Sequence, residues 1–501
     1  MAEELHHTGL AALPHHNNQI HHTKGEKMGN IARFCVLKNR NKFYLYDWKM
    51  IEIYEIGEAM YELLLHIENM EKSEFINKVL ESNIEYKEDI IDLINEDRLF
   101  YDSEEKFADQ IEYPSCINIM CGVGHNCNLD CQYCFLKDRK GNKEQIDDTN
   151  VVLNILPIIN HVYNNYNEIR VAITDGGEPF LFRDRIIDLL TEIDKIDIDR
   201  KVKITVVTNG TIYDEEILNI LSEHDATIVF SLEGHLDNNK IRKSKNKIDN
   251  YTLCANNYAK YQEVLKSKIT KNIWASSIVN AETGSIVSTL IDSYNLGFRT
   301  IQLRIIKGMK NGVGVNNLNL NRFFELYDEL FDFFIKNIDD NEDKYLKAIL
   351  NNGDFVGQLF VPLLLGRAKV KHCLGAFSTI SIDSDGKIYP CTYLNGESNS
   401  EIHIFCNEDK VVKQYQELHI DSIEKCSRCW ASTACGGHCP YQSIQYGKIF
   451  NEPDESVCEL TQHVLQNIIY LIDYLEGNNP TMYTNIYNFA KKRTYLYDLL
   501  R

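Results

Sequence analysis

The sequence predicts an α/β fold: a partial, TIM-like (β/α)6 barrel, preceded by a winged-helix-like α+β module and followed by a cysteine-rich domain. Two observations favour the barrel. Six apolar runs of strand length recur between residues 112 and 310, and a helix-like segment follows each run. Strands that alternate with helices form a parallel sheet, which right-handed crossovers curl into a barrel. Seven of the eight cysteines between residues 373 and 458, all except Cys406, form a spaced pattern that indicates the third part.

Composition restricts the class of protein. The chain has 501 residues, of which 44% are hydrophobic and 25% charged, so we expect two to four globular domains. A formal net charge of −20 argues against a broad nucleic-acid-binding surface. No apolar run approaches the ~20 residues that span a bilayer, and no export signal is recognisable, so we expect no membrane partner and a cytoplasmic location. In a reducing cytosol, grouped cysteines more often bind metal or do redox chemistry than form disulfides.

The first 105 residues divide into two parts. Residues 1–30 carry six histidines among polar and small residues, and we expect a disordered extension there. Residues 31–105 begin with a pair of strands within 33–50 and end with a strand near 98–102. Between these strands, three amphipathic segments predict helices. The first of them places five apolar side chains on one face: Ile56, Met60, Leu63, Leu64 and Ile67.

The barrel is expected over residues 112–310. Its strands are predicted within residues 116–121, 168–179, 201–210, 226–234, 270–279 and 299–306, and its first helix within 149–165. Ligands of such barrels sit at the carboxyl ends of the strands, where this chain has a cysteine loop and the runs GGEP, TNG and SLEG. A helical bridge (311–372), the cysteine-rich domain (373–460) and a C-terminal helical segment (461–501) are expected to follow.

Three cysteines lie close together in the loop after the first barrel strand. Cys127, Cys131 and Cys134 have the spacing C-x3-C-x2-C. A tetrahedral zinc site needs a fourth ligand, and His125 is near enough in sequence to supply it. An iron–sulfur cube also has four ligand positions, so three thiolates would leave one iron open to a small molecule. The spacing alone does not separate the two.

The order of the segments at the carboxyl edge of the predicted sheet favours the iron–sulfur cube over the zinc site. Tyr133 directly precedes the last of the three cysteines, and GGEP follows the second strand. This pattern resembles that of the radical S-adenosylmethionine (SAM) enzymes. The resemblance implies that Cys127, Cys131 and Cys134 hold a catalytic [4Fe–4S] cluster whose fourth iron binds SAM. Backbone or side-chain oxygens of the GGEP segment would receive the methionine amino group. The implied SAM contacts are Tyr133, Phe135, Gly176, Gly177, Glu178, Pro179, Ser231, Glu233, Arg242 and Ser276.

Each of these contacts also has a purely structural interpretation. GGEP and TNG are common turns, and a lone serine in a strand is usually structural. By the resemblance, the tyrosine and phenylalanine line the adenine, Ser231 and Glu233 bond the ribose, and Arg242 and Ser276 are candidates for the carboxylate. Arg304, in the sixth strand, is more often a salt-bridging residue in such a position.

The C-terminal cysteines follow the pattern C-x12-G-x4-C, C-x2-C-x5-C-x3-C and a final C. A structural zinc site uses four thiolates, and seven cysteines fit it poorly. The pattern resembles the SPASM domain, which implies two auxiliary [4Fe–4S] clusters and therefore three clusters in the chain. One would be held by Cys426, Cys429, Cys435 and Cys458, and the other by Cys373, Cys391 and Cys439. The fourth ligand of the second cluster stays open: Cys406, a non-cysteine side chain or a substrate thiol.

Residues 31–105 resemble, in pattern and position, the PqqD-like recognition domains fused to maturases of ribosomally made peptides. In that family a leader peptide adds as a strand at the sheet edge. Together, the resemblances imply a radical SAM peptide maturase. It would take electrons from a flavodoxin or ferredoxin, cleave SAM to a 5′-deoxyadenosyl radical and oxidise a precursor peptide that carries a leader, with a thioether crosslink as the leading product.

Two other functions stay open. An anaerobic sulfatase maturase shares the barrel and the SPASM domain and makes formylglycine. Such enzymes commonly have an acidic residue after the G-x4-C cysteine, where this chain has Thr392, and they lack the recognition module. A non-catalytic iron–sulfur protein that carries electrons or binds peptide would need no SAM pocket.

Overall fold

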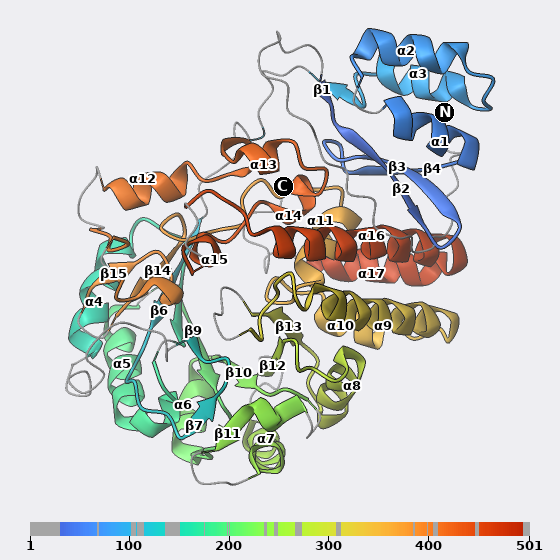
Figure 1. Cartoon of the computed structure of the whole chain (residues 1–501). Helices are drawn as coiled ribbons and strands as arrows, with labels where there is room; N and C mark the ends of the chain where they lie inside the picture. The colour runs from blue at the N-terminus through green and yellow to red at the C-terminus, as the bar shows by residue number, and fades with distance from the viewer. Residues whose placement is uncertain are drawn as a thin grey trace.

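The computed structural model describes most of the chain (Figure 1). The described residues are 31–67, 70–101, 107, 115–135, 151–174, 176–197, 199, 201–234, 238–244, 249–265, 273–306, 312–383, 386–397, 399–403, 409–445 and 450–493. The expected extension at 1–30 and Cys406 lie outside them.

A small α+β module opens the described chain. Its antiparallel sheet has the order β2-β3-β4, from strands Phe34–Asn39, Lys42–Asp47 and Glu52–Ile56. Helices α1 (Glu58–Ile67), α2 (Lys72–Glu81) and α3 (Lys87–Asn95) follow, and β1 (Ile31–Ala32) pairs with β5 (Phe100–Tyr101). The expected strand pair, helices and final strand are present, and β4 is a strand that the sequence did not predict. The turn at Arg40 and Asn41 has positive φ at both residues, which suits a tight hairpin.

The module sheet is buried on both faces. Phe43 and Leu45 of β3 pack with the module's own helices. The alternate side chains, Tyr44, Tyr46 and Trp48, belong to the core of the main body. This alternation follows from the two-residue period of a strand, and it fixes the module against the rest of the molecule.

The main sheet has eight strands in the order β13-β12-β10-β9-β8-β6-β14-β15 (Figure 1). Six parallel strands are the ones predicted: β6 (Cys116–Cys121), β8 (Glu168–Ile173), β9 (Val202–Thr208), β10 (Thr227–Ser231), β12 (Ile273–Val279) and β13 (Ile301–Ile305). Each is followed by a helix: α4 (Val151–Val162), α5 (Arg183–Ile196), α6 (Glu215–Glu223), α7 (Asn250–Leu265), α8 (Ile286–Leu296) and α9 (Leu320–Asp339). The α/β prediction with a parallel sheet is confirmed.

The cysteine-rich region extends this sheet. β14 (Thr379–Ile382) runs parallel to β6, and β15 (Ile388–Tyr389) pairs antiparallel with β14. The barrel and the region after residue 373 therefore share one sheet, an arrangement that the sequence did not predict. A second small sheet joins β7 (Leu129–Cys131) to β11 (Arg242–Ser244) and so ties the cysteine loop to the segment after β10.

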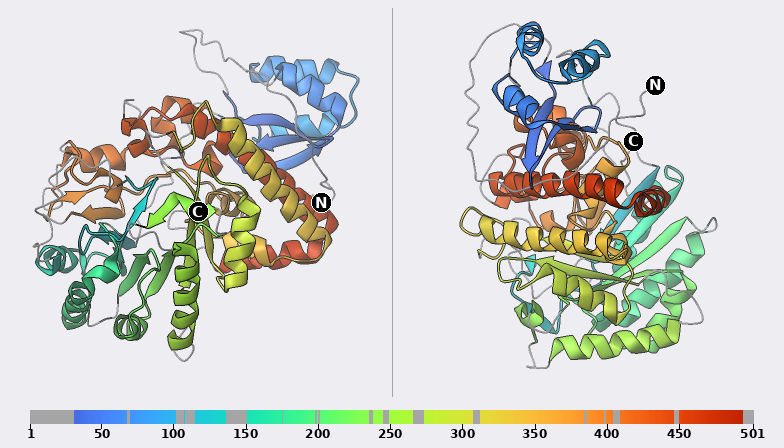
Figure 2. Two further views of the ribbon diagram at one scale, coloured as in Figure 1. Left: turned by 60° about the horizontal axis from the view of Figure 1, so that its bottom comes forward. Right: turned by 90° about the vertical axis from the view of Figure 1, so that its right-hand side faces the viewer.

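Helices complete the body. The bridge contains α10 (Lys344–Ile349) and α11 (Gly357–Leu364), and the cysteine-rich region contains α12 (Lys410–Gln416), α13 (Glu424–Ser427), α14 (Ser432–Cys435) and α15 (Pro440–Gln445). The C-terminal helices are α16 (Glu455–Asn478) and α17 (Pro480–Lys492), and α16 packs along α9 (Figure 2). Within the described part of the chain, no helix combines the length and apolar character that a membrane crossing requires.

Candidate functional site

The cysteine loop and the GGEP segment are joined by their backbones. Gly124 and Gly176 form a β-bridge, the Gly177 N–H donates to the Gly124 carbonyl at 2.7 Å, and the Glu178 N–H donates to the Asn126 carbonyl at 2.8 Å. A Cβ on Gly177 would lie 1.7 Å from the Asn126 oxygen, and one on Gly176 would lie 2.2 Å from the Gly124 oxygen. Both glycines are therefore required by the close approach of the two loops, whatever ligand they also face.

Glu178 is a buried acceptor inside this junction. Its carboxylate accepts hydrogen bonds from the Thr208 hydroxyl at 2.6 Å, from the Asn209 N–H at 2.7 Å and from the Phe180 N–H at 3.2 Å. Burial raises the pKa of Glu178, and these donors oppose the rise. Both oxygens are engaged within the protein, so the side chain ties GGEP to TNG and supports the loop that precedes it.

Asn209, in the TNG turn, is a site residue that sequence reasoning missed. Its side-chain amide donates to the Asn128 oxygen at 2.8 Å and approaches the Cys127 sulfur at 3.7 Å. The Leu129 N–H also points at this sulfur, at 3.4 Å. Donors of this kind favour the thiolate form, which is the form that binds metal. An asparagine directly after a barrel strand was the only signal in the sequence.

Arg242, Glu233 and Tyr133 form a buried network beside Cys131. Arg242 is 1% exposed, lies 4.0 Å from Glu233 and donates to the carbonyls of Ser231 and Asn209. The Tyr133 hydroxyl donates to Glu233. Burial raises the pKa of Glu233, and the nearby guanidinium opposes the rise. Burial also raises the pKa of Cys131 to about 11, against the same guanidinium. A metal bound to the sulfur in place of the thiol proton would offset this rise in pKa.

The remaining predicted SAM contacts lie on neighbouring elements. Ser231 at the end of β10 is in register with Ser276 of β12, so the two side chains share one face of the sheet. Phe135 packs against Tyr393 with ring centroids 4.6 Å apart, and Tyr393 lies 4.8 Å from Tyr441. This row of rings connects the cysteine loop with the cysteine-rich region. Pro179 begins a 3-10 turn and is buried.

His125 lies at the edge of the first cysteine group. Its imidazole Nε2 is 3.9 Å from an Asp383 carboxylate oxygen. Among the described residues, no set of three or more Cys, His, Asp or Glu side chains converges on one metal ion.

The C-terminal thiols come together in two sets. Cys391 is close enough to Cys373 and Cys439 for both to add to the rise in the pKa of its thiol, which burial causes first. In the same way, burial raises the pKa of Cys458 to about 12, with contributions from Cys435 and Cys429. Cys426 adjoins the same three thiols. The structure thus groups these seven cysteines as three and four.

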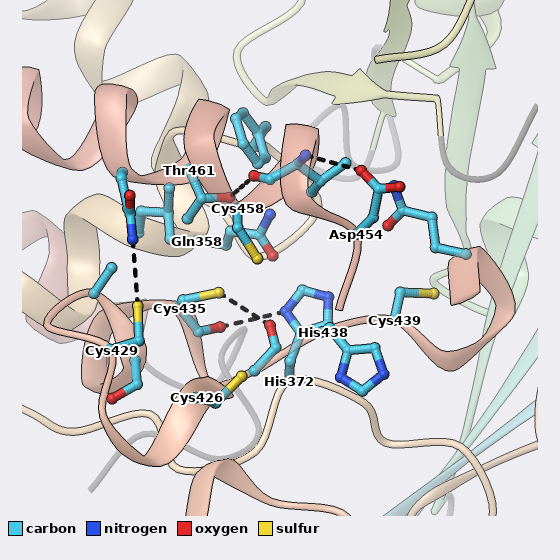
Figure 3. A pocket seen from close by; sticks show the side chains of 18 of the residues that line it. Gln358, His372, Cys426, Cys429, Cys435, His438, Cys439, Asp454, Cys458 and Thr461 are labelled. Atoms are coloured by element: carbon cyan, nitrogen blue, oxygen red, sulfur yellow. Dashed lines mark hydrogen bonds between the residues drawn. The ribbon is translucent and has the colours of Figure 1, made fainter. Parts of the chain in front are cut away.

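The four-thiol set surrounds a cavity between α16 and the 426–439 segment (Figure 3). Cys458 reaches it from the first turn of α16, because this helix begins at Glu455. The Gln462 amide donates to the Cys429 sulfur at 3.5 Å. His372, His438 and Cys439 also line the cavity.

These donor sets fit iron–sulfur clusters. Buried thiols that raise one another's pKa values would repel as thiolates unless cations separate them. In a cube each thiolate binds its own iron, so the ligands surround a cluster and need not converge on one ion. Soft thiolate donors are the ligands that such clusters take.

Comparison with known proteins assigns the barrel. Residues 122–273, which include the three cysteines and GGEP, match the family model of the Radical SAM superfamily. This chain contains a radical SAM domain. The superfamily implies a [4Fe–4S] cluster and SAM.

The radical SAM domain has relatives of several activities. A cysteine-type anaerobic sulfatase-maturating enzyme of Clostridium novyi is 24% identical over 342 residues, which cover 63% of this chain and 85% of that protein. The radical SAM cyclopropyl synthase TigE of Paramaledivibacter caminithermalis is 22% identical over 439 residues, covering 82% of this chain and 85% of that protein. The solved structure of native anSMEcpe with bound AdoMet and Cp18Cys peptide superposes with a TM-score of 0.53 at 18% identity, over 74% of this chain and 99% of that one. This likeness confirms the radical SAM fold.

Proposed function

We propose that this radical SAM enzyme is a peptide maturase, which oxidises a ribosomally made precursor peptide, with a thioether between a cysteine sulfur and a carbon as the leading product. The observation that carries the proposal is the N-terminal module, whose sheet has β4 as an edge strand and one of whose faces is fixed to the cysteine-rich body. Such a module suits a protein that captures a peptide and presents it to a fixed site.

The sheet has two edge strands, β2 and β4, and β2 contacts α16. We therefore consider β4, which pairs with β3 and with no other strand among the described residues and whose five residues are all half-buried. A leader peptide added there would gain main-chain hydrogen bonds, while alternate side chains on one face of β4, such as Tyr54 and Ile56, supply specificity. An exposed strand edge favours aggregation, and proteins usually cover it, so an uncovered edge is consistent with a binding role.

The module is held to the body by specific contacts. The Tyr44 hydroxyl donates to the buried Asp473 carboxylate of α16 at 2.6 Å. The Thr433 hydroxyl donates to the Trp48 carbonyl, and Tyr46 packs edge-on against Trp430 with centroids 6.2 Å apart. Both contacts from the body lie between two cysteines of the four-thiol set, Cys429 and Cys435. The distance from leader edge to barrel would therefore be constant.

The site residues have separate roles in this proposal. Cys127, Cys131 and Cys134 would hold the cluster, which with bound SAM would supply the radical chemistry that removes a hydrogen atom from an unactivated carbon. The carbonyls of Gly176 and Gly177 accept from the methionine ammonium, and Glu178 holds their loop in place. In the thioether step, the substrate C–H and S–H bonds are lost and one C–S bond forms. 5′-Deoxyadenosine carries the hydrogen atom, solvent takes the thiol proton, and an auxiliary cluster takes the remaining electron.

Coexpression with a cysteine-containing precursor peptide, followed by mass spectrometry, tests the proposal. Each modified site should lose the mass of two hydrogens, and anaerobically reconstituted enzyme should release 5′-deoxyadenosine from SAM and dithionite. Replacing Cys131 by alanine should abolish both. Release of 5′-deoxyadenosine without any mass change in leader-bearing peptides would count against the peptide-maturase assignment, and no release at all would favour an electron carrier.

A second candidate is sulfatase maturation, which the Clostridium relative favours. Its match covers 63% of this chain, whereas the TigE match covers 82%. Thr392, after Cys391, is buried and cannot serve as the acidic residue common at that position. A sulfatase-derived peptide that gains an aldehyde in the reconstituted reaction would establish this function instead.

A further inference from the structure

Among the described residues, no fourth thiol joins the three-thiol set, and a buried nitrogen of a neighbouring residue has no hydrogen-bond partner. The set contains Cys373, Cys391 and Cys439. His438 directly precedes Cys439, and its Nδ1 is buried with no hydrogen-bond partner among the described residues. A buried polar atom without a partner is costly, so this nitrogen calls for a ligand.

The other ring nitrogen of His438 is already engaged. Nε2 lies 2.9 Å from the carbonyl oxygen of Phe450. A carbonyl only accepts, so Nε2 carries the proton and Nδ1 presents its lone pair. Metal-binding histidines show this arrangement, in which the second N–H donates to a backbone carbonyl and orients the ring. The ring is thus prepared as a neutral nitrogen donor.

His438 lies between the two sets: it lines the cavity of the four-thiol set, and it directly precedes Cys439, which lines the same cavity and belongs to the three-thiol set. Gly436 and Gly437 both have positive φ, 79° and 106°, and turn the chain just before His438. A Cβ on Gly436 would lie 3.0 Å from the backbone nitrogen of His372, so the segment runs beside the residues that lead into Cys373. Phe450, which accepts from the ring, packs with the aromatic cluster around Cys373, Cys391 and Cys439.

We propose that His438 Nδ1 is the fourth protein ligand of the cluster bound by Cys373, Cys391 and Cys439. The four-thiol set needs no further donor, whereas the three-thiol set needs one. Side chains of consecutive residues splay apart in an irregular segment, and each ligand of a cube binds a different iron, so His438 and Cys439 can serve one cluster. The inference rests on the proposed function, because it requires the auxiliary clusters.

Two consequences follow for the cluster. Imidazole in place of thiolate removes one negative charge, which raises the reduction potential, as it does in Rieske centres. An auxiliary cluster with a higher potential is a better electron acceptor for a substrate radical. With its four positions filled, the cluster would act in electron transfer, and a substrate thiol would reach its iron only by displacing the imidazole.

Pulsed EPR of the reduced, anaerobically reconstituted full chain tests the assignment. A variant with Cys127, Cys131 and Cys134 all changed to alanine removes the signal of the SAM cluster. We expect a nitrogen coupling that changes on labelling with 15N-histidine. His438→Cys should keep the iron content, lose this coupling and lower the midpoint potential of one cluster.

His372 supplies the matched control, since it lines the same cavity and its Nδ1 lies 3.3 Å from the Cys435 carbonyl oxygen. His372→Asn should retain the coupling. Iron–sulfur clusters without a histidine coupling, or a coupling lost in His372→Asn and kept in His438→Cys, would overturn the ligand assignment and leave the proposed function intact. Zinc in place of iron would overturn both. If a variant fails to fold, the unsubstituted chain labelled with 15N-histidine still tests the assignment, because the absence of a histidine nitrogen coupling would overturn it.

Discussion

Substituting Gly177 by alanine should disrupt the radical SAM site through the backbone alone. The new Cβ would lie 1.7 Å from the Asn126 oxygen, against the 3.4 Å or more of an ordinary contact. The loops must therefore separate by more than an ångström, which breaks the hydrogen bonds from Gly177 to Gly124 and from Glu178 to Asn126. Two such bonds contribute about 2 kcal/mol together, equivalent to roughly a 30-fold change in an equilibrium.

The assay is 5′-deoxyadenosine release by reconstituted enzyme at subsaturating SAM, together with hydrogen exchange of residues 122–128. We expect release to fall by roughly 30-fold and the loop amides to exchange faster. Gly57→Ala is the matched control, because a Cβ on Gly57 would meet nothing within 4 Å. Unchanged release and unchanged loop protection in Gly177→Ala would refute the reasoning that the junction holds the cysteine loop.

Three further predictions concern buried polar groups, each measured by anaerobic thermal unfolding. Tyr44→Phe removes the buried hydrogen bond that docks the N-terminal module and should lower the free energy of unfolding by about 1–3 kcal/mol. Its control, Tyr474→Phe, removes an exposed hydrogen bond and should lower it by under about 0.5 kcal/mol. Equal losses of stability in the two variants would contradict this prediction. Burial raises the pKa of Asp354 to about 7, so the native state keeps a proton that the unfolded chain releases, and unfolding free energy should fall as pH rises from about 4 to 7. Asp354→Asn should remove that slope, and a persisting slope would exclude this carboxyl as its source. Arg242→Met strands the buried carboxylate of Glu233 and should cost about 3–5 kcal/mol. Adding Glu233→Gln to Arg242→Met should recover part of the loss, and no recovery would show that the pair is not coupled.

The sequence predicted the barrel because each of its strands is one short apolar run of consecutive residues. Each apolar run between residues 116 and 306 became a strand of the parallel sheet, since burial on the helix-covered face selects β-branched residues at alternate positions. The cysteine spacing and GGEP also lie in single loops, so the radical SAM domain was recognisable from the sequence.

Contacts between distant segments were not predictable in this way. Nothing in Thr379–Ile382 indicates that β14 joins the barrel sheet beside β6, because its partner lies some 260 residues earlier. β4 reads EIYEI, which lacks the strict polar–apolar alternation of a half-buried strand, so its signal was weak beside the neighbouring helix pattern. Glu178 was expected to contact SAM, which stays a prediction, and the structure adds hydrogen bonds to its carboxylate from Thr208, Asn209 and Phe180 that the sequence did not indicate.

The sequence by itself determined which residues are candidates for the chemistry: the ten grouped cysteines and the edge segments of the barrel, whose identity depends on spacing within short loops. Only the tertiary structure decided which groups meet. It set the seven C-terminal thiols into a three and a four, buried Nδ1 of His438 in the cavity between α16 and the 426–439 segment, and turned the aromatic face of β3 onto the body. The physical reason is that spacing constrains neighbours along the chain, whereas contacts between remote segments depend on how buried surfaces pack and on which buried polar atoms find partners.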